Sequence, residues 1–264
     1  MLFMEYFSIF EPSSKVSLNS LKDKLSRDDL KDNLERNYTY PQEDYLIAEP
    51  PVFVVSDGVT LDFKRLSEKN KKYPNPSPAG EVAKIFCQAV VKKAQELYGD
   101  FGIESVSEVF KVGNRQVGEF NKKIEKSDIS GNPTGFYSAT GAFVVVKENK
   151  AYWASICDSF VAHFDKNMNL KFMSSGSCTP YAVINGEEKM ASHLETGVFD
   201  IEPGDRVLVL TDGFEHYVTN SDFLEMFKNW DRNLKTRIAE FSKNVIPKDP
   251  QKFGHERSLI AVSF

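Results

Sequence analysis

Two stretches of this chain share one pattern, a run of apolar, mostly β-branched residues that ends in Asp-Gly. The first is VFVVSDG, residues 52–58, and the second is RVLVLTDG, residues 206–213. Four consecutive residues of this kind are typical of a strand buried on both faces. Glycine lets the backbone turn tightly beside each aspartate. We therefore expect two buried strands that deliver Asp57 and Asp212 to the rim of a sheet.

Carboxylates at two strand ends can point at one place and form an oxygen-lined site for a hard divalent cation. The backbone carbonyl of the neighbouring glycine, as at Gly58, is a further oxygen ligand within reach. A single Asp-Gly pair after an apolar run is more often an ordinary turn, so each pair alone is a weak signal. The metal site becomes the stronger interpretation only if other acids fall at the same rim.

Further acids lie at the ends of neighbouring strands. Glu43 and Asp44 precede a short apolar stretch, and a Pro-rich turn separates it from the strand at residues 52–57. We expect a hairpin that sets Glu43 and Asp44 close to Asp57. Two solvated loop acids remain an alternative from spacing alone. Asp158 follows the apolar stretch AYWASIC and is a third acid at a strand end.

Apolar periodicity predicts two long helices in the middle of the chain. Apolar residues recur at spacings of three and four through residues 77–98 and again through 103–124. This spacing indicates amphipathic helices that cover a sheet. The other predicted elements are three strands within 135–164, helical stretches at 220–230 and 232–243, and a strand at each end of the chain.

Length and composition favour one domain. The chain has 264 residues, of which 41% are hydrophobic, enough for one large core. We predict a single domain over residues 1–264, with loop or flap excursions at 11–40 and 165–200. Residues 62–78 are charged and rich in proline, and we predict a loop there.

Charge, hydropathy and cysteine content exclude several classes of function. A net charge of −5 without a basic cluster argues against a nucleic-acid partner. No apolar run approaches the roughly 20 residues of a membrane helix. The cysteines Cys87, Cys157 and Cys178 lack CxxC spacing and are odd in number, which argues against a disulfide framework and a zinc ribbon. His163 and His193 are expected to be ordinary core or surface histidines. We expect a cytoplasmic monomer with no membrane contact.

In this order the motifs resemble the metal-dependent Ser/Thr protein phosphatases of the protein phosphatase 2C (PPM) type. The resemblance runs from about Pro41 to Phe264 and rests on QEDYLI, VVSDGV, SATGAFVVV, ASICDSFVA, PGDRVLVLTDG and HERSLIAV. It implies an α+β fold, a four-layer α-β-β-α sandwich of two antiparallel sheets flanked by helices. The implied activity is that of a hydrolase: metal-bound water at a binuclear Mn²⁺ or Mg²⁺ centre cleaves phosphomonoesters, foremost phosphoserine or phosphothreonine on a protein substrate.

The resemblance also implies a role for each acid. Asp57 would bridge the two ions, with the Gly58 carbonyl on one of them. Glu43 would bind that same ion directly or through water, and Asp212 would hold the other. Asp158 with Asp212 would offer a place for a third ion. The metal-binding set implied in this region is Glu43, Asp44, Asp57, Gly58, Asp158 and Asp212, and its catalytic members are Asp57, Asp212 and Glu43.

The closing motif departs from the family pattern. The family has an aspartate three residues before a Ser or Thr, and that place, counted back from Ser258, is His255. Three interpretations stay open: His255 binds the metal, the neighbouring Glu256 binds it, or water takes the position. An imidazole ligand would favour Mn²⁺ over Mg²⁺ and would weaken metal binding on acidification through roughly pH 6–7.

Two further positions depart from the pattern. The second acid expected four residues after Asp212 is His216, and the phosphate-clamping arginine falls on Thr39, with Arg36 nearby. These changes leave two rival hypotheses beside the phosphatase. One is a catalytically weak relative kept as a regulatory or binding module. The other is a structural α/β domain with incidental acids, which predicts no specific binding of divalent metal.

Overall fold

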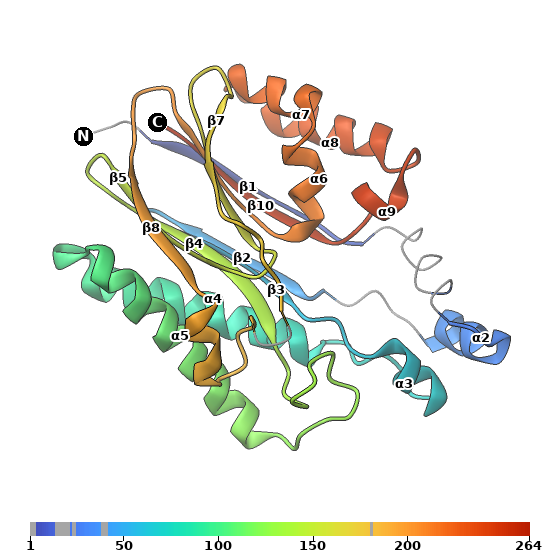
Figure 1. The fold of residues 1–264 in the computed structure, drawn as a ribbon. Coiled ribbons are helices and arrows are strands. Elements are labelled where there is room, and N and C mark those ends of the chain that lie inside the picture. The colour runs from blue at the N-terminus through green and yellow to red at the C-terminus, as the bar shows by residue number, and fades with distance from the viewer. Residues whose placement is uncertain (1–3, 14–21, 23–24, 38–41, 180–181) are drawn as a thin grey trace.

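Two five-stranded antiparallel sheets stack face to face, and helices cover the outer face of each, which gives four layers (Figure 1). The computed structural model describes residues 4–13, 22, 25–37, 42–179 and 182–264. The predicted α-β-β-α sandwich of two antiparallel sheets is confirmed.

Each sheet combines strands from distant parts of the chain. The first sheet has the order β2 (Asp44–Glu49), β3 (Val52–Gly58), β4 (Ala139–Lys147), β5 (Lys150–Ile156) and β8 (Glu195–Asp200). The second sheet has the order β1 (Glu5–Glu11), β10 (Arg257–Ser263), β9 (Arg206–Leu210), β6 (Phe160–Phe164) and β7 (Leu170–Met173). The hairpin predicted around residues 45–57 is confirmed, because β2 and β3 pair with Asp44 opposite Asp57.

Strand β3 is buried on both faces, as its apolar run predicts. Phe53 and Val55 point between the sheets, where they pack with Val209 and Ile260 of the second sheet. Val54 points the other way, into the core beneath the helices. Successive side chains of a strand alternate between its faces, so a run without polar residues fits a strand covered on both sides.

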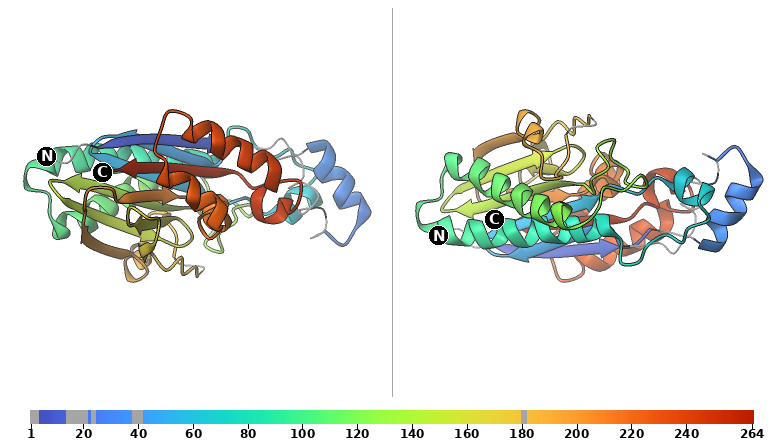
Figure 2. Two further views of the ribbon diagram at one scale, coloured as in Figure 1. Left: turned by 90° about the horizontal axis from the view of Figure 1, so that it is seen from above. Right: turned by 90° about the horizontal axis from the view of Figure 1, so that it is seen from below.

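The helices fall into two outer layers, seen from opposite sides in Figure 2. Helices α4 (Pro78–Leu97) and α5 (Ile103–Lys123) cover the first sheet, and the Ser77 hydroxyl caps α4 by accepting from the Ala79 N–H. Within the described part of the chain, every helix is too short or too polar to span a lipid bilayer. The second sheet is covered by α6 (Glu215–Val218), α7 (Ser221–Glu225), α8 (Leu234–Val245) and α9 (Pro250–Phe253). Short 3₁₀ helices lie at Tyr98–Asp100, Glu188–Ser192, Asp212–Phe214 and Met226–Lys228.

Two helices lie outside the sandwich layers. Helix α2 (Asp28–Asn37) falls within the predicted 11–40 excursion, and α3 is Phe63–Glu68. The prediction of a loop at 62–78 is therefore wrong over α3. Asp62 caps this helix by accepting from the Arg65 N–H at 3.1 Å. The charge and proline content of residues 62–78 favoured a loop, and the short helix leaves little apolar signal because only Leu66 and Ser67 are buried.

The cysteines also differ from the expectation. Cys157 and Cys178 form a disulfide with their Cα atoms 4.3 Å apart, so the prediction of no disulfide is wrong for this pair. Their 21-residue separation gave no signal because the fold, and not the local sequence, brings them together. Cys87 is a free, buried thiol on α4, in the core beneath the first sheet's helices.

Candidate metal centre

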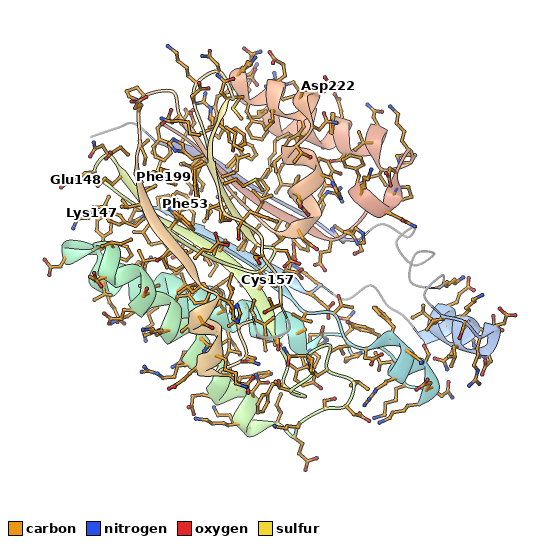
Figure 3. The ribbon with its side chains drawn as sticks, in the orientation of Figure 1. Phe53, Lys147, Glu148, Cys157, Phe199 and Asp222 are labelled. Carbon is orange, nitrogen blue, oxygen red and sulfur yellow. A yellow bond between two sulfur atoms is a disulfide. The ribbon has the colours of Figure 1, made fainter. Side chains whose placement is uncertain are left out.

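The acids predicted at strand ends meet at one end of the sandwich. Asp57 and Asp158 line one cavity of about 300 Å³. Cys157, which directly precedes Asp158, is labelled at this end in Figure 3. Thr211 joins the two sheets there: its hydroxyl donates to Asp44 Oδ2 at 2.8 Å and accepts from the Ser258 N–H at 2.9 Å.

Glu43 is buried among hydroxyl groups. Its Oε1 accepts from the Tyr73 hydroxyl at 2.7 Å and from the Ser77 hydroxyl, and its Oε2 accepts from Thr60 Oγ1 at 3.3 Å. Its backbone carbonyl accepts from the Gly58 N–H at 3.0 Å. Burial raises the pKa of Glu43 to about 7, although the three hydroxyls oppose the shift. These hydroxyl partners were not predicted, and only Ser77 had a signal, as the start of a helix.

Glu256 reaches the acids from the start of β10. Both of its carboxylate oxygens accept from the Glu43 N–H at 3.1 Å, and Oε1 also accepts from the Asp44 N–H at 3.2 Å. Gly213 permits this approach, because a side chain there would collide with the Glu256 carbonyl oxygen. His255 is exposed to solvent. The structure therefore brings Glu256 to the other acids and leaves its neighbour at the surface.

Crowding of like charges perturbs the whole group. Burial, followed by the charges of Asp44, Asp212 and Asp158, raises the pKa of Asp57 well above its ordinary value. Burial raises the pKa of Asp44 to about 6. Part of Asp212 is exposed, but desolvation of its carboxylate and the charge of Asp158 raise its pKa to about 8. Burial and the charge of Asp44 raise the pKa of Glu256 to about 8.

Asp158 lies in the turn between β5 and β6. The preceding residue, Cys157, has a φ of 59°, in the left-handed region that non-glycine residues rarely adopt. Within the described residues, Asp158 Oδ1 is buried and has no hydrogen-bond partner. Burial raises the pKa of this carboxyl above its ordinary value. A buried carboxylate oxygen without a donor is costly unless something outside the chain satisfies it.

The donor set fits a hard divalent cation. In the part of the chain that the structure describes, no lysine, arginine or histidine forms a salt bridge with any of these acids. Carboxylate and carbonyl oxygens are the ligands that Mg²⁺ and Mn²⁺ prefer. We call this group the acid cluster, and its members are Glu43, Asp44, Asp57, Asp158, Asp212 and Glu256.

The remaining predicted positions lie at the edge of this cluster or away from it. His216 is exposed on α6 beside Glu215, whose charge contributes to the raised pKa values of Asp158 and Asp212. Glu215 was not predicted, because the family pattern points to the next residue, His216. Thr39 lies outside the described residues. Arg36 is exposed at the end of α2, and its Nε donates to a carbonyl of its own helix.

A model of the Protein phosphatase 2C family matches residues 41–245, a span that contains most of the acid cluster. The chain belongs to the protein phosphatase 2C family. The match extends from just before Glu43 through α8, so it includes both Asp-Gly strand ends. No curated protein sequence matches the chain.

Solved structures share the fold of this protein phosphatase 2C member over nearly its whole length. The catalytic domain of the serine threonine protein phosphatase PstP, in complex with two manganese ions, is 15% identical, covers 100% of this chain and 99% of its own, and has a TM-score of 0.61. PppA, a T6SS regulatory component of Pseudomonas aeruginosa, is 10% identical, with 99% and 97% covered and a TM-score of 0.62. RsbX in complex with magnesium is 11% identical, with 99% and 98% covered and a TM-score of 0.52. At such identities the likeness establishes the fold.

Proposed function

We propose that this protein hydrolyses phosphomonoesters, foremost phosphoserine and phosphothreonine on proteins, and that it requires two Mn²⁺ or Mg²⁺ ions. The observation that carries the proposal is the acid cluster, which gathers carboxylates from both sheets without a cationic partner among the described residues. Family membership supports the reaction class. The metals in the similar PstP and RsbX structures support the choice of ions.

The positions of the acids support specific roles. Asp57 would serve both ions, because it lies opposite Asp44 in the β2–β3 pair and lines the same cavity as Asp158. Asp212 would bind on the side of the second sheet, and Asp158 with Asp212 would hold a third ion. Bound ions would supply an activated water and positive charge for the phosphoryl group.

The partners of the remaining acids support roles in positioning. Glu43 would bind on the side of the first sheet, together with the Gly58 carbonyl. The hydroxyls of Tyr73 and Ser77 fix the Glu43 carboxylate, so they orient a ligand without touching the substrate. Glu256 is preferred over His255 at the closing position because it accepts from the backbone of the first sheet.

Phosphate release tests the proposal directly. Phosphoserine peptides, phosphothreonine peptides and p-nitrophenyl phosphate are each incubated with the full chain in Mn²⁺, in Mg²⁺ and in excess chelator. We expect release with either metal and none above background with chelator. Activity that chelator leaves unchanged would contradict metal dependence.

A catalytically weak regulatory or binding module is the second candidate. It is favoured by the departures from the family pattern at Thr39, His216 and His255, and by Arg36, which is exposed and bonded to its own helix. This candidate predicts tight Mn²⁺ binding without phosphate release from any of the three substrates. Cytoplasmic location and a monomeric state are also proposed, and cell fractionation and size-exclusion chromatography test them.

A further inference from the structure

The Cys157–Cys178 disulfide lies beside the acid cluster. Cys157 follows the last residue of β5 and directly precedes Asp158. Cys178 belongs to the segment 174–179, which follows β7 and forms neither helix nor strand. Cys157, Asp158 and Thr179 line the same cavity as Asp57. The covalent bond is therefore part of the wall of the candidate active site.

Hydrogen bonds hold the beginning of this segment to the strands. The Ser174 N–H donates to the Val161 carbonyl, and the Ser174 hydroxyl accepts from the Val161 N–H at 3.1 Å. Ser175 donates through its N–H and its hydroxyl to the Glu195 carboxylate, at 2.9 and 2.5 Å. The disulfide then ties the continuation of the segment, at Cys178, to the turn that carries Asp158.

The two cysteine residues differ in their exposure to solvent. Cys178 is an exposed residue, whereas Cys157 is only 7% exposed. An external thiolate therefore attacks Cys178 Sγ, the Sγ–Sγ bond breaks, and Cys157 leaves as a thiolate that takes up a proton. A second external thiol then resolves the mixed disulfide. In sum, one protein disulfide and two glutathione thiols give two protein thiols and one glutathione disulfide.

The bond acts on Asp158 through the backbone of its neighbour. Cys157 is held in the left-handed region, which a non-glycine residue keeps only when its surroundings fix it. Reduction removes the covalent restraint on that residue and on the segment across the cavity. The Asp158 carboxylate, one residue further, then loses its fixed place beside the acid cluster.

We propose that Cys157 and Cys178 form a reversible redox switch: the disulfide fixes Asp158 for metal binding, and reduction releases it. This inference rests on the proposed function for its effect on turnover. In the reduced state we expect a weaker affinity for the last-bound Mn²⁺ ion and slower phosphate release, each by about tenfold, the loss typical for a displaced metal-site group.

The test uses the full chain equilibrated in glutathione buffers from fully reducing to fully oxidising. One aliquot of each sample is alkylated, and mass spectrometry measures the fraction of the Cys157–Cys178 disulfide. After glutathione is removed without oxygen, Mn²⁺ binding and phosphate release are measured on the rest. The disulfide fraction, the affinity for the last-bound Mn²⁺ and the rate should rise together.

Two variants control the interpretation. Cys178→Ser should behave like the reduced wild type in every buffer. Cys87→Ala, which removes the buried thiol outside the pair, should keep the full redox response. A response that disappears with Cys87→Ala would overturn the assignment to the pair.

The outcomes separate the switch from the proposed function. The switch is overturned if the disulfide never forms or if fully reducing glutathione does not reduce it. It is also overturned if the Mn²⁺ affinity and the rate of phosphate release do not depend on the disulfide fraction, or if they fall as that fraction rises. If no sample releases phosphate while Mn²⁺ affinity follows the disulfide fraction, the switch stands and the proposed activity fails.

Discussion

Among the residues that the structure describes, two groups of buried acids have opposite surroundings. Asp205, just before β9, is hydrogen-bonded to His163 Nε2 at 2.7 Å and accepts from Lys171 Nζ and the Glu202 N–H, both at 3.1 Å. Burial alone would raise the pKa of Asp205, but the Glu202, His163 and Lys171 bonds outweigh it and lower the pKa. His163 is a buried core histidine, one of the two placements that the sequence left open.

Among the described residues, hydroxyl and N–H groups donate to members of the acid cluster, but no cationic side chain pairs with them. Asp57 is surrounded by other carboxylates, and both burial and their charges raise its pKa. Asp205 receives its counter-charge from neighbouring side chains, whereas the acid cluster must take protons or ions from outside. The fold thus gives the buried Asp205 a cationic partner, and, within the described part of the chain, it leaves the acid cluster without one at the place where we propose that metal binds.

The largest expected effect is the difference in phosphate release between a variant of the acid cluster and a variant of Asp205. Asp57→Ala should lower phosphate release at least about a hundredfold. Losing a residue that only hydrogen-bonds a metal ligand lowers activity by up to about a hundredfold, and losing the proposed bridging ligand itself should lower it no less. Asp205→Asn is the matched control: it should keep turnover but lower stability by about 1–3 kcal/mol, because it weakens a buried hydrogen-bonded group. Kinetics and urea unfolding on both variants measure this, and similar behaviour of the two would remove the distinction.

Within the acid cluster, Asp212 and Asp158 should differ. Asp212→Asn should lower the affinity for tightly bound Mn²⁺ and the rate together. Asp158→Asn should lower the rate with less effect on tight binding, since this carboxylate is assigned to a third ion. Calorimetric titration of both variants measures the affinities. Equal loss of tight binding would show that Asp158 belongs to the binuclear pair.

A smaller effect should distinguish Glu256 from His255. Glu256→Gln should weaken Mn²⁺ binding about tenfold, because a charged acceptor next to the first sheet becomes neutral. His255→Ala should change binding less than about twofold, as is usual for an exposed side chain. If His255→Ala instead weakens Mn²⁺ binding about tenfold, the imidazole is the ligand. The same conclusion follows if Mn²⁺ affinity falls on acidification through roughly pH 6–7 only while His255 is present.

The smallest effect concerns the stability of the metal-free protein. The pKa of Glu43 is raised from 4.5 to about 7, so its contribution to stability is present below pH 4.5 and is lost as pH rises through about 7. Thermal unfolding in chelator should therefore shift to lower temperature between pH 5 and pH 8. Glu43→Gln should flatten this dependence, and Mn²⁺ at pH 8 should reverse it. A rise in Tm over that range in chelator would contradict the raised pKa.

The buried strands and the two long helices could be predicted because apolar runs and apolar periodicity leave a simple signal, whereas the sandwich arrangement was implied by the resemblance to the protein phosphatase 2C family. The choice between His255 and Glu256 could not be predicted from the sequence, because counting back from Ser258 gives a position along the chain but not the direction of its side chain. The contact between Tyr73 and Glu43 joins residues 30 apart, and no local spacing indicates it. Such contacts depend on how α3 and α4 pack against the strand ends.

The most direct test of the account is a calorimetric titration of the metal-free chain with Mn²⁺ at neutral pH, with Asp57→Ala and Asp205→Asn beside it. We predict that wild type and Asp205→Asn each bind two ions tightly and that Asp57→Ala loses both. A wild type that binds no Mn²⁺ would contradict the proposal that the acid cluster is a metal centre. Asp57→Ala that binds as tightly as wild type would contradict it equally.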